Sequence, residues 1–498
     1  MTVERAITGV AENATSRLFA DGREGALAKV FWIAVALGAT AAVPAILSAQ
    51  GLAYDGGYYL LAVATRGQLQ LSEPARHSVQ FLQQIFAVAG AALGVHDLRT
   101  FGILFSLATA GWPLVITALC WFALPRGQKI WIAGPLFNLV FAIPATSFIG
   151  IGEGIIASCL LWLAFLLVAF RMERPAGALA AVVAVGVCAV VHESAILCLA
   201  VIAVAAALQL RRAKGICRAA AIVIIFLALA GAADMLRWIV LPRDTIERGD
   251  YLVGLLGGFI GTPGAPNIPA LASFSGAAAI LIAVRRPRLA RWVAAAAVVA
   301  FVCLFAFLWL APEEAISPSP YFAARGLPVA LTTILMVVFL YYQRSGQTLA
   351  RFATPPVLVI VLALATAQAA GQFAITREWN SYAQALRTLV STDSGLIPHA
   401  RAMAALDSAG GRFRREMLEH WSVEPLSILL CPAGHVRAVV MPAPTAKWVP
   451  YDFHHFERVP RGPELDWTQF HARSWQTRMD RRWPPSYFRP MSGAPIRA

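Results

Sequence analysis

Long apolar runs alternate with short polar segments along most of this chain, and each run has about the length that crosses a bilayer. A membrane-spanning helix needs roughly 20 apolar residues, and about eleven segments fit by length and lack of charge. The predicted spans are Val30–Ser48, Phe101–Leu124, Ile130–Phe148, Gly154–Phe170, Ala176–Val191, Ala195–Leu210, Ala219–Leu241, Leu271–Val284, Trp292–Ala311, Leu327–Tyr342 and Pro355–Ala374. The pattern predicts an all-α polytopic membrane protein, with a polar segment (residues 1–28) before a transmembrane domain (residues 29–375).

Short loops rich in Arg and Lys occur at every second connection between the predicted spans. The five basic loops carry Arg126 and Lys129; Arg171 and Arg174; Arg211, Arg212, Lys214 and Arg218; Arg285, Arg286, Arg288 and Arg291; Arg344 and Arg351. Because basic loops stay in the cytoplasm, the N-terminal segment is predicted to be cytoplasmic and the intervening loops to face outward. An odd number of spans also places the C-terminal part outside. The predicted location is a bacterial-type inner (plasma) membrane.

The segment Ile85–Val95 decides the topology of the first outer loop, residues 50–98. It is apolar but only about half as long as a span. We therefore expect it to lie in the membrane interface without crossing the bilayer. If it crossed, Asp55 would lie on the cytoplasmic side, while the later loops would keep their predicted positions.

The composition changes after Gly371, where the chain becomes rich in Arg, Trp, Pro and His. This region is predicted to form a small extracytoplasmic α+β domain, residues 376–498. Its predicted helices are Trp379–Val390 and Arg401–His420, and its predicted strands are Leu426–Cys431 and Val436–Met441.

Composition and charge agree with a membrane protein and argue against other classes. The chain is 58% hydrophobic and 14% charged, whereas a soluble domain has about 25% charged residues. The net charge of +14 lies largely in short loops beside apolar runs, so no nucleic-acid partner is predicted. The seven cysteines have no metal-ligand or CxxC spacing, and the adjacent His454 and His455 lack supporting ligands. No cofactor is predicted, and a divalent metal has no motif to support it.

The candidate chemistry begins at Asp55, in Tyr-Asp-Gly-Gly-Tyr-Tyr directly after the first span. A carboxylate at a membrane edge can serve as a general base, because partial desolvation favours the protonated form. The following glycines permit close backbone approach. Tyr58 and Tyr59 are predicted to bind substrate by stacking on a sugar ring, or to anchor the loop at the interface. The alternative for Asp55 is a cap of a helix that starts at Gly56.

Two further acidic positions lie on the predicted outer side. Glu153 follows Ile-Gly-Ile-Gly, and His192-Glu193 interrupts a long apolar stretch. Ionisable residues at membrane depth are functional by default, so Glu153 and Glu193 are predicted to be catalytic and His192 to contact substrate. The alternative is that these residues mark surface turns.

Basic residues and two more acids complete the predicted outer face. Arg325, Arg76 and His77 are predicted to bind an anionic substrate group, since a guanidinium can hold a phosphate bidentately. The alternative for Arg325 is an interfacial anchor. Glu313 and Glu314 lie on the same predicted side.

This layout resembles the GT-C superfamily of integral membrane glycosyltransferases. Members have many spans, an acidic catalytic residue in a long first outer loop, and helices of that loop lying on the membrane. Asp55 and Ile85–Val95 match that pattern, although Gly56 stands where a second acid is common. The resemblance implies a polyprenyl-phosphate-sugar donor and a glycan, lipid or protein acceptor. Asp55 would deprotonate the acceptor hydroxyl, and Arg325, His192 or Arg76 would stabilise the leaving phosphate.

Three other classes fit parts of the pattern. A polysaccharide polymerase or ligase also joins lipid-linked sugars outside, and the loop Pro242–Ala270 is the feature that favours it. A transporter or flippase predicts charges near the membrane midplane and broken helices. A non-enzymatic assembly protein would use the C-terminal domain as its working part.

Overall fold

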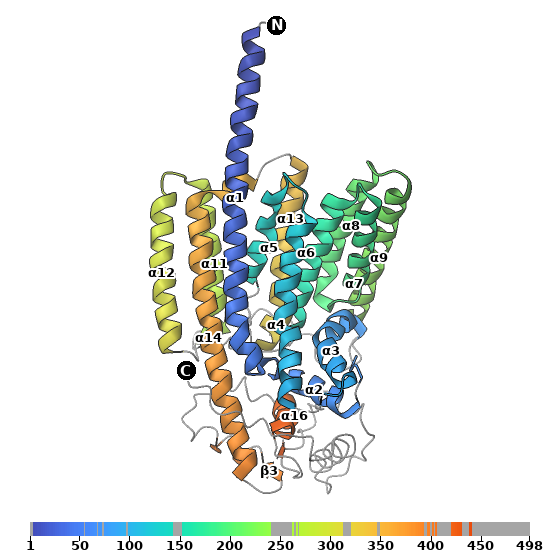
Figure 1. Ribbon diagram of the computed structural model, residues 1–498, viewed down its shortest axis with the longest axis vertical. Helices are drawn as coiled ribbons and strands as arrows, with labels where there is room; N and C mark the ends of the chain where they lie inside the picture. Colours follow the sequence, from blue (N-terminus) through green and yellow to red (C-terminus); the bar gives the residue numbers. More distant parts are fainter. Residues whose placement is uncertain are drawn as a thin grey trace.

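The chain forms a helical bundle, shown in Figure 1. The computed structural model describes residues 3–53, 55–66, 68–71, 74–95, 98–142, 152–240, 261–262, 265–266, 268–311, 320–345, 349–392, 396–398, 401–402, 404–405, 420–430 and 438–440. Within these residues, β-structure is limited to the antiparallel pair β1 (Gly261–Thr262) and β2 (Ala265–Pro266) and the parallel pair β3 (Leu396–Pro398) and β4 (Ala438–Val440).

Seven helical segments among the described residues are long and apolar enough to cross a membrane. They belong to α1 (Val3–Leu47), α4 (Leu98–Ala123), α6 (Glu153–Arg171), α8 (Ile196–Leu210), α9 (Gly215–Val240), α12 (Ala290–Leu310) and α14 (Pro355–Thr392). The chain is therefore a multi-pass, all-helical membrane protein.

Four further bundle elements account for the other predicted spans. They are the segment Lys129–Ala142, α7 (Pro175–Cys188), α11 (Ile268–Arg285) and α13 (Pro320–Ser345). Every one of the eleven predicted spans thus overlaps helical structure in its described residues, with residues 143–148 of the third span outside them. The third is irregular: it combines the 3-10 helix η3 (Lys129–Ile132), α5 (Ala133–Phe137) and the π-helix η4 (Asn138–Ala142). Pro135 lacks an amide hydrogen and so weakens the regular pattern there.

Helix α6 is the most enclosed of the spans and lies at the centre of the packing. It contacts α4, α7, α8 and α13. Its Trp162 is fully buried and lies against Gly134 of α5, where an added Cβ would come within 2.4 Å of the indole ring. Small residues at such crossings let membrane helices approach closely.

The two ends of the bundle can be told apart from the described residues of α4 and α6. At one end, Arg171 at the end of α6 donates to the carbonyl oxygens of Phe122, Ala123 and Leu124 at the end of α4. Lys129 reaches the same turn, donating to the Leu124 carbonyl at 2.9 Å. Since α4 and α6 both finish here, their first residues lie at the other end. We call these the basic end and the acidic end.

Helix α3 (His77–Ala92) stays at the acidic end and does not run the length of the bundle. Trp112 of α4 donates its indole N–H to the Leu82 carbonyl at 2.9 Å. Leu104, closer to the start of α4, lies against Gly90 near the end of α3. Helix α3 therefore lies along about the first half of α4 (Figure 1). The prediction that Ile85–Val95 does not cross is consistent with this placement.

Beyond the bundle, the structure differs from the predicted pattern in two places. Helix α14 is continuous for 38 residues, so the predicted span Pro355–Ala374 and the predicted helix Trp379–Val390 are one element. The predicted strand Leu426–Cys431 is wrong for residues 426–430, which belong to α16 (His420–Leu430). Val423, Leu426 and Leu430 are buried in a cluster that includes α2 residues, and their spacing is that of one helical face.

The remaining C-terminal predictions are tested only in part. Strand β4 falls within the predicted strand Val436–Met441 and pairs with β3. Most of the predicted helix Arg401–His420 and all residues after 440 lie outside the described residues. The α+β domain at residues 376–498 therefore stays a prediction.

Candidate functional site

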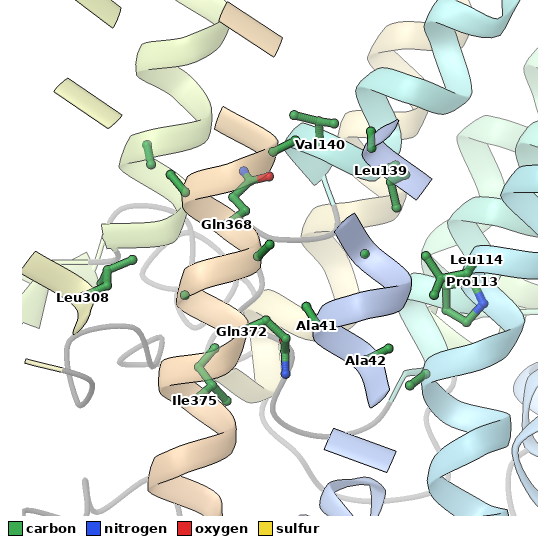
Figure 2. A pocket seen from close by; sticks show the side chains of 18 of the residues that line it. Ala41, Ala42, Pro113, Leu114, Leu139, Val140, Leu308, Gln368, Gln372 and Ile375 are labelled. Atoms are coloured by element: carbon green, nitrogen blue, oxygen red, sulfur yellow. The ribbon is translucent and has the colours of Figure 1, made fainter. Parts of the chain in front are cut away.

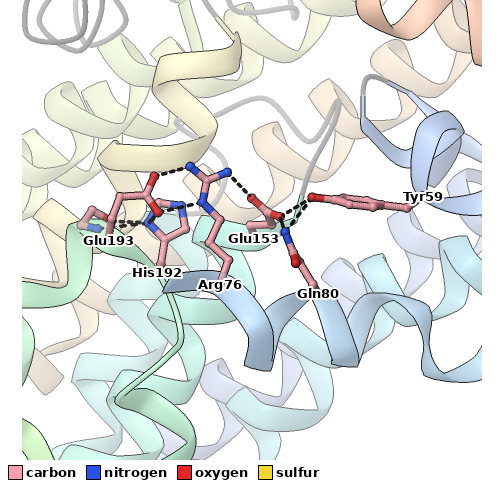
Figure 3. Close-up of polar contacts among 7 residues, drawn as sticks. Tyr59, Arg76, Gln80, Glu153, His192 and Glu193 are labelled. Atoms are coloured by element: carbon pink, nitrogen blue, oxygen red, sulfur yellow. Dashed lines mark hydrogen bonds and ion pairs between the residues drawn. The ribbon is translucent and has the colours of Figure 1, made fainter. Parts of the chain in front are cut away.

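Three segments that are far apart in the sequence meet at Arg76. This residue ends the 3-10 helix η2 (Pro74–Arg76) and immediately precedes α3. Glu153 is the first residue of α6, and Glu193 begins the 3-10 helix η6 (Glu193–Ala195) that leads into α8. Figure 3 shows the guanidinium of Arg76 between the two carboxylates.

The guanidinium of Arg76 binds both carboxylates directly. Its Nε donates to Glu193 Oε2 at 2.7 Å, and its Nη2 donates to Glu193 Oε1, so this pair is bidentate. Its Nη1 donates to Glu153 Oε2 at 3.1 Å. The exposed fractions are 6% for Arg76, 0% for Glu153 and 9% for Glu193. Charge-assisted hydrogen bonds of this kind are the strong ones, and burial strengthens them further.

The other oxygen of Glu153 is held by two neutral side chains. Tyr59 of α2 (Asp55–Arg66) donates its hydroxyl to Glu153 Oε1 at 3.1 Å. The amide of Gln80 donates to the Tyr59 hydroxyl at 2.9 Å and lies 3.5 Å from Glu153 Oε1. Both oxygens of Glu153 therefore accept hydrogen bonds from the first outer loop.

His192 forms the far end of the same network. Its ring is fully buried, and its Nδ1 lies 3.6 Å from Glu193 Oε2 and 2.8 Å from Ser194 Oγ. The backbone N–H of Ser194 donates to Nδ1 at 3.2 Å. A nitrogen that accepts this bond carries no proton, so the contact corresponds to the neutral ring with its proton on Nε2.

The electrostatics of the network follow from its position in the fold. Both glutamates lie in the first turn of a helical segment, where the helix dipole favours a negative charge. One guanidinium faces two carboxylates, so two negative charges share one buried positive charge. Such an arrangement ties the start of α3 to α6 and α8, because removal of Arg76 would leave two buried carboxylates without this cation. We call Tyr59, Arg76, Gln80, Glu153, His192 and Glu193 the Arg76 network.

Five of the predicted site residues belong to this network, namely Tyr59, Arg76, Glu153, His192 and Glu193. Tyr58 is half-buried, and its ring centroid lies 5.6 Å from that of Tyr59. His77, next to Arg76, is also half-buried. The roles predicted for these residues stay predictions, since geometry shows their placement alone.

Asp55 lies one helical turn before Tyr59. Helix α2 begins at Asp55 itself, so this half-buried carboxylate occupies the first turn, one residue earlier than the predicted helix start. Residues four apart lie on the same face of a helix, which places Asp55 on the face of α2 that carries Tyr59. The helix start is closely packed: a Cβ at Gly56 would lie 1.8 Å from the Gly51 carbonyl oxygen. Only glycine fits there.

Several predicted positions lie outside the described residues. Arg325 belongs to α13, but its side chain is not described. The side chains of Glu313 and Glu314, of the loop Arg243–Asp250 and of the C-terminal histidines are not described either. Within the described part of the chain, no group of three or more His, Cys, Asp or Glu side chains is placed to hold a metal ion.

Gln80 is the member of the network that the sequence prediction missed. A signal for it does exist in the sequence, because Gln80, Gln83 and Gln84 stand within an otherwise apolar helix. All three are buried, whereas Phe81 on the same helix is 42% exposed. Helix α3 thus turns its amides toward the bundle and an aromatic ring toward its surroundings.

Comparison with known proteins gives no family for this chain: no family model matches it, and neither do curated proteins or solved structures.

Proposed function

We propose that this protein is a membrane glycosyltransferase of the GT-C kind. It would move a sugar from a polyprenyl-phosphate donor to a glycan, lipid or protein acceptor at the outer face of the membrane. The observation that carries the proposal is the Arg76 network itself, which gathers acid, base and cationic side chains from three segments at the end of the bundle where Asp55 also lies.

In this proposal Asp55 is the general base. Its carboxylate takes the proton of the acceptor hydroxyl as that oxygen bonds to the anomeric carbon. The bond between the anomeric carbon and the phosphate oxygen breaks, and the lipid phosphate leaves with the electron pair. Arg76, His77 and Arg325 are the proposed cationic groups for that phosphate, and Tyr58 is the proposed sugar-stacking ring.

The geometry favours a positioning role for Glu153 and Glu193. Both oxygens of each carboxylate already accept hydrogen bonds or ion pairs from the network. Because protein donors already occupy these carboxylates, the proposal assigns them no proton transfer. Glu153 and Glu193 would instead hold Arg76 in place.

A transporter or flippase is the alternative from a different class. It needs charged residues near the middle of the spans, whereas the Arg76 network lies where α6 and α8 begin. The polymerase or ligase alternative shares the lipid-linked substrate and differs in the acceptor. An assembly protein would use the network only as a clamp between α3, α6 and α8.

The test is consumption of a polyprenyl-phosphate-linked sugar pool by membranes with and without this protein. The proposal predicts that the protein releases the lipid phosphate and transfers the sugar. A quenching assay on fluorescent lipid-linked sugar in the same vesicles measures movement between leaflets. Movement across the bilayer without consumption would contradict the proposal and support a flippase.

A further inference from the structure

A second feature of the bundle lies on the other side of α4 from α3. It is an apolar pocket with a cavity volume of about 110 Å³ between α1, α4, η4, α11, α12 and α14. Figure 2 shows its walls, including Gln368 and Gln372 on α14 and Ala41 and Ala42 on α1. Pockets that enclose drug-sized molecules have volumes of about 300–1,000 Å³, so this smaller space would hold only part of a lipid, such as a segment of its hydrocarbon chain with a small polar group.

The lining is apolar and made largely of small side chains. Helix α1 contributes Ala34, Gly38, Ala41 and Ala42, and α14 contributes a similar set that includes Ala369 and Gly371. None of the described residues that line the pocket is charged. The lining therefore favours a hydrocarbon chain and offers no cation for a phosphate group.

One polar atom in this wall lacks a partner. Gln368 donates its amide N–H to Ser273 Oγ at 3.3 Å, which fixes the side chain against α11. Its Oε1 is buried and has no hydrogen-bond partner among the described residues. A buried acceptor without a donor is costly, so a ligand with an O–H or N–H group in this pocket would relieve that cost.

The pocket is separate from the Arg76 network. On α4, Leu104 and Trp112 contact α3, whereas Ala110, Pro113 and Leu114 line the pocket. At 100° per residue, these two sets occupy roughly opposite faces of the helix. The ligand of the pocket is therefore not the substrate group held at the acidic end.

We propose that this pocket binds a neutral membrane lipid with a hydrogen-bond donor next to its hydrocarbon chain. The chain lies against the alanines and glycines of α1 and α14, and the donor group bonds to Gln368 Oε1. A monoacylglycerol has this chemistry. A phosphodiester-headed lipid would place a negative charge where the lining has no cation.

Native mass spectrometry of the purified full chain tests the proposal with three probes. They are monooleoylglycerol, methyl oleate, which has the same chain without hydroxyl groups, and phosphatidylglycerol. Wild type should retain monooleoylglycerol about fivefold more than methyl oleate, the factor expected for one hydrogen bond. Gln368→Leu should remove that preference while still retaining both oleoyl chains.

Variants that fill the space separate ligand binding from the amide contact. Gly38→Leu and Gly371→Leu place a side chain in the pocket beside the mobile ends of Leu114 and Leu308, and both should lose all oleoyl probes. Gly111→Leu is the matched control, because Gly111 does not line the pocket and an added Cβ meets only Leu107 of its own helix at 3.6 Å. Binding should be unchanged in this variant.

Three results would overturn the proposal. Equal retention of monooleoylglycerol and methyl oleate by wild type would show that Gln368 does not bind the hydroxyl groups of the lipid. Preferred retention of phosphatidylglycerol would show that the occupant is a charged phospholipid. Absence of every adduct in wild type, or persistence of binding in both filled variants, would show that the pocket is not a lipid site.

Discussion

Replacing Arg76 by glutamine should cost more stability than any other single change in the network. The substitution removes three hydrogen bonds and leaves two buried carboxylates facing each other without a cation. Breaking a buried ion pair by removing one partner costs about 3–5 kcal/mol. The exposed fractions of 6% for Arg76 and 0% for Glu153 leave little solvent to screen the uncompensated charge.

A double substitution separates the part of this stability loss that comes from the uncompensated charge. Arg76→Gln with Glu193→Gln removes the cation and one of the two acids together. Glu153 keeps its donors Tyr59 and Gln80. The double variant should therefore lose less unfolding free energy than the two single variants together, by about 0.5–3 kcal/mol.

The free energy of unfolding can be measured by titration with dodecyl sulfate in mixed micelles, followed by circular dichroism. Arg377→Gln is the matched control. In the described contacts, exposed Arg377 meets only the carbonyl oxygen and the ring of Trp309. This variant should lose no more than about 1 kcal/mol of unfolding free energy. If the double variant lost as much stability as the two single variants together, the charge interaction would be absent. Equal losses of stability for Arg76→Gln and Arg377→Gln would show that burial of the Arg76 network adds nothing.

Three further changes test the packing at Gly56, the hydrogen bond of Tyr59 and the predicted orientation in the membrane. Gly56→Ala should destabilise the protein by about 1–3 kcal/mol, because its Cβ would lie 1.8 Å from a backbone oxygen. Gly22→Ala, at a position inside α1 with open space around it, should instead stabilise the protein by up to about 1 kcal/mol in the same titration. Tyr59→Phe should cost about 1–3 kcal/mol by leaving Glu153 Oε1 with a weaker donor, and wild-type stability would contradict that hydrogen bond. An alkaline phosphatase fusion should be active after Gly67 and inactive after Gly127, and the reverse pattern would invert the predicted orientation.

The helical part of the fold was predictable because it depends on length and hydropathy. Each predicted span overlaps helical structure in its described residues, and the alternation of basic loops placed Glu153, His192 and Glu193 on one side, as found at one end of the bundle. Short apolar runs were less informative. Leu426–Cys431 fits a strand or a helix equally well by its pattern, and burial beside α2 decides in favour of the helix.

The pairing within the site could not be predicted from the sequence. Arg76 bonds to residues 77 and 117 positions later in the chain. Those contacts depend on how α3 lies across α4 and α6, which no local pattern specifies. Gln80 was missed for the same reason, because a glutamine in an apolar helix has no defined partner until the fold brings Tyr59 and Glu153 beside it.

We propose that Asp55 acts as the base for glycosyl transfer at the acidic end of the bundle. The most direct measurement is lipid-linked sugar turnover in membranes that carry equal amounts of wild type, Asp55→Asn and the control Asp234→Asn, whose exposed carboxylate lies near Arg237 on α9. Loss of a general base costs about 10²–10⁴-fold in rate. We expect a loss of turnover rate of this size for Asp55→Asn and the wild-type rate for Asp234→Asn. Full turnover by an Asp55→Asn protein that inserts normally would contradict it.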